Sequence, residues 1–105
     1  MRRGTTPTIV IRVTGEDFDG STLYVTIEQG ALELTKTGSD VTVTPTETGS
    51  TVSLYLTQEE TLMFGKGKAS IQIRWINGSG VAQASPIRTI DVSPILLEGV
   101  IEYGS

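Results

Sequence analysis

Apolar and polar residues alternate with a period of two along most of this chain, and this pattern restricts it to a fold built from β-strands. Successive side chains of a strand point to opposite faces of a sheet, so every second residue shares one face. In the segment 8–14, for example, Ile9, Ile11 and Val13 fall on one side. The alternation therefore predicts strands with one buried and one solvated face.

Seven such segments are bounded by turn residues, at the spacing expected of a β-sandwich. They comprise residues 8–14, 22–28, a third around Leu32 and Leu34, a fourth around Val41 and Val43, and residues 51–56, 68–76 and 81–92. Pro86 interrupts the last segment and predicts an edge position or a bulge near Ser85, because proline cannot donate to a ladder. We expect an all-β, immunoglobulin-like β-sandwich of about seven antiparallel strands.

The chain of 105 residues has the size of one domain. We expect the sandwich to occupy residues 8–93. Residues 1–7 contain Gly4 and Pro7 and are predicted to form a mobile N-terminal arm. Residues 94–105 follow the last strand as an apolar C-terminal tail.

Two adjacent carboxylates, Glu59 and Glu60, raise the question of a catalytic pair. Neighbouring side chains on a helix diverge by about 100°, so they would not converge on one substrate atom. Thr57 three residues before Glu60 instead matches a capping box. The pattern favours a short helical turn near 57–63 that closes one end of the sandwich, and we predict no catalytic residues.

The composition excludes several classes of function. The chain has no cysteine and no histidine, which removes disulfides, thiolate and imidazole chemistry and the usual zinc ligands. The net charge of −4 and the scattered basic residues argue against nucleic acid as a partner. No apolar run is long enough for a membrane span or a signal peptide, so we expect synthesis in a cytoplasm without Sec export, no membrane partner and no cofactor.

Three smaller features keep alternatives open. The turn with Asp17 and Asp19 fits an Asp-Gly connection between strands, although a weak calcium site there stays an alternative. Trp75 is expected in the core, with an exposed binding anchor as the alternative. Exposed aromatic residues gathered in one patch would favour glycan binding; the candidates are Phe18, Tyr24, Tyr55, Trp75 and Tyr103.

The tail is too apolar for a solvated terminus. It contains five aliphatic residues, Ile95, Leu96, Leu97, Val100 and Ile101. They either fold back and cover this chain's own sandwich, or they bind a partner, which would be a second copy or a neighbouring protein. These five residues are the candidate partner-binding site.

Four stretches of the chain, "MRRGTTPTIVIRV", "LTQEETLMF", "IQIRWINGSG" and "ILLEGVI", carry a resemblance over nearly its whole length. They resemble a group of small proteins encoded by bacteriophages and prophages of Firmicutes. The resemblance implies a non-enzymatic structural component of a virion, in the tail or baseplate, with other virion proteins as partners. The alternative is an immunoglobulin-like module that binds a host surface or glycan.

Overall fold

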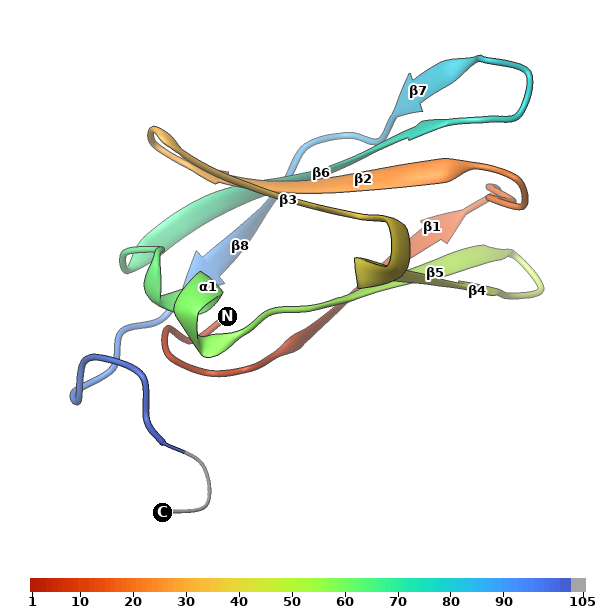
Figure 1. The fold of residues 1–105 in the computed structure, drawn as a ribbon. Helices are drawn as coiled ribbons and strands as arrows, with labels where there is room; N and C mark the ends of the chain where they lie inside the picture. Colours follow the sequence, from red (N-terminus) through yellow and green to blue (C-terminus); the bar gives the residue numbers. More distant parts are fainter. Residues whose placement is uncertain (103–105) are drawn as a thin grey trace.

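The computed structural model describes residues 1–102 and contains two antiparallel sheets packed face to face. Figure 1 shows the two layers, with helix α1 at one end between them. The strands are β1 (Thr8–Thr14), β2 (Thr22–Gln29), β3 (Leu32–Thr37), β4 (Val41–Pro45), β5 (Gly49–Tyr55), β6 (Gly67–Ile76), β7 (Ala82–Ala84) and β8 (Arg88–Val92). The helical elements are the 3-10 turn η1 (Gly38–Asp40) and α1 (Gln58–Leu62). The predicted all-β sandwich is confirmed.

The strand order is that of an immunoglobulin-like sandwich without its first strand. One sheet has the order β1-β5-β4, and the other has β3-β2-β6, with β7 and β8 both pairing with β6. An immunoglobulin sandwich places strands A, B, E and D in one sheet and C, F and G in the other. Taken in chain order, β1, β5 and β4 occupy the places of B, E and D. No strand of the described residues occupies the place of A beside β1.

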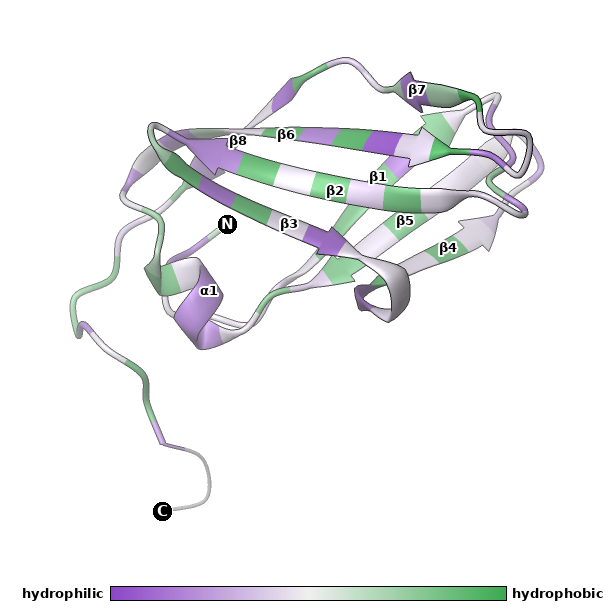
Figure 2. Cartoon of the chain, turned by 45° about the horizontal axis from the view of Figure 1, so that its top comes forward, coloured by the Kyte–Doolittle hydropathy of each residue, from purple (hydrophilic) through white to green (hydrophobic). Residues whose placement is uncertain are grey.

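The core lies between the sheets and is made by the predicted alternating residues. Figure 2 shows the alternation of apolar and polar positions along β2 and β6. Leu23, Val25 and Ile27 of β2 are buried opposite Trp75, Ile73 and Ile71 of β6. The ring of Trp75, only 8% exposed, meets the ring of Phe18 edge-on at 5.1 Å between centroids. The prediction of Trp75 as a core residue is confirmed.

The last predicted strand is split in two at Pro86. Arg74 of β6 pairs with Ala84 of β7, and Ile71 of β6 pairs with Arg88 of β8. Between these two pairs, the three residues 85–87 lie opposite only two residues of β6, 72 and 73. The hydroxyl of Ser85 accepts from the backbone N–H of Ile73 at 3.0 Å and restores a partner that the ladder lacks. The predicted bulge near Ser85 is confirmed.

The N-terminal segment differs from the mobile arm that we expected. Met1 packs against the core, and the backbone N–H of Ser93 donates to the Met1 carbonyl at 2.7 Å. Arg2 and Ser93 form a parallel bridge, and the backbone N–H of Arg3 donates to the Ser93 carbonyl at 3.0 Å. The sequence pattern gave no sign of this because residues 1–7 contain only one large apolar side chain. The segment is fixed by backbone pairing and by polar side chains.

Candidate interaction site

The C-terminal segment, residues 94–102, belongs to no helix or strand and leaves the sandwich near α1 (Figure 1). Leu96 is fully exposed, and Leu97, Ile101 and Val100 are 72%, 59% and 45% exposed. Only Ile95 among the five candidate residues is half-buried, and its side chain lies beside Gly4. The remainder of the predicted tail, residues 103–105, including Tyr103, lies outside the described residues. Four of the five candidate residues therefore do not cover this chain's own sandwich.

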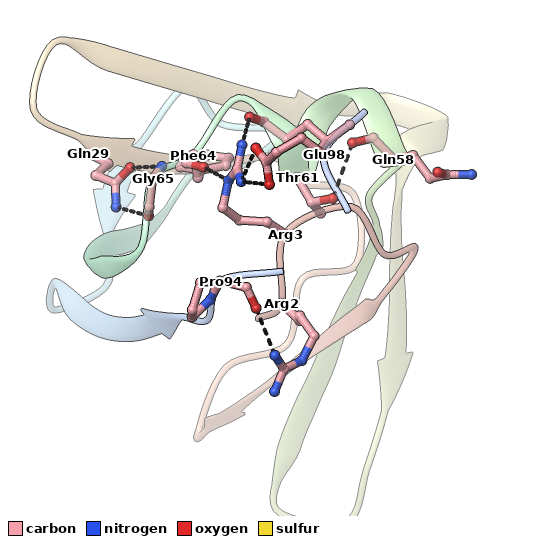
Figure 3. A network of polar contacts seen from close by, with 10 residues as sticks. Arg2, Arg3, Gln29, Gln58, Thr61, Phe64, Gly65, Pro94 and Glu98 are labelled. Carbon is pink, nitrogen blue, oxygen red and sulfur yellow. Dashed lines mark hydrogen bonds and ion pairs between the residues drawn. The ribbon is translucent and has the colours of Figure 1, made fainter. Parts of the chain in front are cut away.

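The segment is nevertheless held in place by side chains of the N-terminal segment and of α1, as Figure 3 shows. Arg2 donates from Nη1 to the Pro94 carbonyl at 2.8 Å. Arg3 donates from Nη1 to both carboxylate oxygens of Glu98, at 2.6 and 2.8 Å. Gln58 accepts from the backbone N–H of Ile101 at 2.9 Å and donates to its carbonyl at 3.1 Å.

Arg3 also joins the segment to the body of the fold. Its guanidinium donates to the carbonyl of Leu62, the last residue of α1, and to that of Phe64, two residues beyond the helix. The Leu62 carbonyl lacks a partner within the helix, and a cation there also interacts favourably with the helix dipole. The apolar side chains of the segment are thus displayed from an anchored backbone.

A groove of about 510 Å³ runs between β1 and β8, beside the edge of β1 that no strand in residues 1–102 covers. Its floor is apolar and includes Ile9, Ile11, Val13 and Ile90, all only half-buried. Two exposed arginines, Arg12 and Arg88, line it together with polar side chains, and no acidic residue lines it. The arrangement suits an extended apolar segment that carries negative charge.

The two carboxylates near α1 serve the local structure. Thr57 accepts through Oγ1 from the Glu60 backbone N–H at 3.2 Å, and Glu60 accepts from the Thr57 backbone N–H at 2.9 Å. This confirms the capping box. Burial raises the pKa of Glu60, but the hydrogen bond and charge of Lys36 and the bonds from Thr57 outweigh it, so the net pKa lies below its usual value. Glu59 is exposed and does not join this network.

The turn with Asp17 and Asp19 is closed by its own residues, since the Asp17 carboxylate accepts from the Asp19 backbone N–H at 3.0 Å. Within residues 1–102 no three His, Cys, Asp or Glu side chains gather closely enough to hold a metal ion. In the same part of the chain, no helix is both long and apolar enough to cross a membrane.

The exposed tyrosines lie on opposite outer faces of the sandwich. Tyr24 belongs to β2 in one sheet and Tyr55 to β5 in the other. Phe18 and Trp75 are both buried. The described aromatic residues therefore do not form the contiguous patch that would favour glycan binding.

Comparisons of the chain with protein-family models, with curated proteins and with solved structures found no match.

Sequence reasoning identified the apolar segment but missed its anchors and the groove. Arg3 and Gln58 are polar residues distant from the segment in sequence, and no local pattern signals such pairings. The groove lies where no strand of the described residues pairs with the outer edge of β1, and it becomes visible only when the strand order of both sheets is known.

Proposed function

We propose that this chain is a non-enzymatic structural module of a bacteriophage or prophage virion, in the tail or baseplate, and that its C-terminal segment binds a neighbouring subunit. One observation carries the proposal: Leu96, Leu97, Val100 and Ile101 are exposed on a segment whose backbone is anchored by Arg2, Arg3 and Gln58.

An anchored, exposed apolar segment is suited to association. Each large aliphatic side chain contributes about 1.5–3 kcal/mol when it is fully removed from water. The anchors at Pro94, Glu98 and Ile101 keep these side chains off the chain's own sandwich, where a neighbouring subunit can reach them. A solvated segment needs neither exposed aliphatic side chains nor anchors. A module within a particle needs a contact of this kind with its neighbour.

The virion role is supported by the resemblance of the four sequence stretches to small phage and prophage proteins. A passive role in the particle agrees with how the carboxylates near α1 are used. Glu60 caps a helix and pairs with Lys36, so one of the two carboxylates that first suggested chemistry has a structural role, while Glu59 is exposed to solvent.

The proposal is tested on particles produced from a phage or prophage genome that carries this gene. We expect the protein to co-purify with particles on a density gradient, detected by mass spectrometry. Particles from a genome with Leu97→Asp should lack the protein, because a charge in an apolar contact is costly. Val81→Asp is the matched control, since Val81 is an exposed aliphatic residue of the β6–β7 turn. Absence of the wild-type protein from the particles would refute the virion role.

A further inference from the structure

We propose that the groove between β1 and β8 is the acceptor for the C-terminal segment of a second copy of this chain, which adds along β1 as the outer strand that this sheet lacks. The inference deepens the proposed function and rests on it, because it names the partner of the same segment. It predicts a head-to-tail contact, in which the segment of each copy enters the groove of the next.

The first observation is that the outer edge of β1 is free to pair. The carbonyl of Pro7 accepts from Leu56 N–H, and Gly15 N–H donates to the Thr48 carbonyl, so the odd-numbered residues of this stretch direct their backbone toward β5. The N–H and C=O groups of a strand residue point to the same side, and neighbouring residues alternate. Val10 and Arg12 therefore present their backbone groups to the open edge, where no described strand pairs with them.

The opposite edge of the same sheet is protected. At β4, the Val41 N–H donates to the Gly38 carbonyl, and Pro45 has no N–H to offer. Proline and local turns are common means of blocking an edge strand. The β4 edge is therefore blocked at both of its ends and leaves only the Val43 N–H free, whereas the edge of β1 has no such block.

The second observation is that the inward side chains of β1 are incompletely covered. Ile9, Ile11 and Val13 face the core but remain half-buried, and they line the groove. The corresponding residues of β5, which has a strand on each side, are buried. A strand added beside β1 would remove more of this apolar surface from water.

The C-terminal segment has the pattern that such a strand needs. In an extended conformation Ile95, Leu97 and Ile101 share one face, and Leu96, Glu98 and Val100 share the other. The uncharged face suits the groove floor. Glu98 then lies on the outer face of the sheet, which is also the face of Arg12 on β1.

Charge complementarity supports this pairing. The groove is lined by Arg12 and Arg88 and by no acidic residue. Residues 94–102 carry two acidic residues, Glu98 and Glu102, and no basic one. Docking as an added strand releases Glu98 from Arg3 and the Ile101 backbone from Gln58. The ion pair costs little to release, because one with a carboxylate that is 59% exposed contributes at most about 1 kcal/mol, and the freed N–H and C=O of Ile101 become available for new backbone pairing.

A second copy is the occupant, since this chain's own segment is directed away from its groove. The bridge between Arg2 and Ser93 and the bond from Arg2 to Pro94 hold the chain at the α1 end of the sandwich. From there the segment extends outward beyond the sheets in both Figure 1 and Figure 2. Addition of an extended segment to an exposed sheet edge is a common mode of recognition.

The test measures self-association of the full chain by sedimentation velocity up to high micromolar concentration. Val10→Pro removes an outward N–H of the open edge, and Val43→Pro removes the equivalent N–H at the opposite edge as the control.

Arg12→Glu places a repulsive charge in the groove, and Arg74→Glu, at an exposed arginine of β6 outside the groove, is its control. Leu97→Asp disables the segment itself. Thermal unfolding identifies any variant that fails to fold. If Val10→Pro fails to fold, the comparison of Arg12→Glu with its control Arg74→Glu tests the groove.

We expect concentration-dependent association of the wild type, weakened at least about tenfold by Val10→Pro, Arg12→Glu and Leu97→Asp and unchanged in both controls. A mixture of Leu97→Asp and Arg12→Glu chains should form heterodimers and nothing larger, because each supplies one intact half of the contact. Association that is lost only in Leu97→Asp overturns the groove as acceptor while leaving the proposed function intact. A monomeric wild type also overturns the inference, and the particle experiment then judges the proposed function separately.

Discussion

Arg3 and Glu98, 95 positions apart, form a two-pronged contact in which one guanidinium nitrogen donates to both carboxylate oxygens. The same guanidinium donates to the Phe64 and Leu62 carbonyls. The arginine is therefore shared between the exposed segment and the end of α1. The side chain of Arg3 is 18% exposed and that of Glu98 is 59% exposed. We therefore expect Arg3 to contribute more to the stability of the fold than Glu98.

Replacing Arg3 with Met should lower the free energy of unfolding by about 2 kcal/mol, because the carbonyls of Leu62 and Phe64 lose a charged donor. Glu98→Gln should change it by less than about 1 kcal/mol, since the exposed ion pair is screened by solvent. Chemical denaturation of both variants measures the difference. Equal losses in the two variants would show that the ion pair, and not the carbonyl bonds, makes Arg3 important.

Removing the helix cap with Thr57→Ala should lower the free energy of unfolding by about 1 kcal/mol. The Glu60 N–H then loses its acceptor, the Thr57 hydroxyl at 3.2 Å. Thr57→Ser is the matched control because it keeps the hydroxyl and should retain most of the stability. The cap would be unimportant if the alanine and serine variants had the same melting temperature.

The contact of Glu60 with Lys36 should make stability depend on pH. The pKa of Glu60 is lowered in the folded chain, so its ionised form stabilises the fold above the unfolded pKa of about 4.3. This contribution declines as the pH falls and disappears below the folded pKa. The melting temperature of the wild type should therefore exceed that of Glu60→Gln at neutral pH and approach it in acid. Glu59→Gln, at the exposed neighbour, controls for the change in net charge; a constant gap between wild type and Glu60→Gln would contradict the prediction.

Most of the fold could be predicted from the sequence because its strands have one buried face. Period-two alternation gave β1 with its observed bounds and β2 and β6 within one residue of theirs. Thr57 and Glu60 identified the helix start through side-chain chemistry that acts over three residues. Pro86 located the bulge because proline has no N–H and therefore interrupts the ladder at its own position.

The features that failed prediction depend on contacts between distant residues. Arg3 meets Glu98 only after both sheets have formed, and residues 1–3 pair with residues 91–93 through the backbone, which has no sequence signature. The five aliphatic residues of the tail were recognised from composition. Their exposure depends on where Arg2 and Gln58 fix the chain, which local patterns do not encode.

The close approach of β1 and β5 at Gly49 makes that position the most restrictive of the glycines within residues 1–102. A Cβ there would overlap the Val13 carbonyl oxygen and lie 2.8 Å from Gly15 N and 2.9 Å from Thr14 Cα, all backbone atoms that cannot rotate away. We expect Gly49→Ala to destabilise the chain by about 3 kcal/mol or more, because the β1–β5 ladder must shift. Gly65→Ala is the matched control, since the nearest atom to its Cβ would be Gln29 Oε1 at an ordinary 3.8 Å. Thermal unfolding of both variants measures the effect, and a Gly49→Ala chain as stable as the Gly65→Ala chain would mean that the two strands can separate at this end without cost.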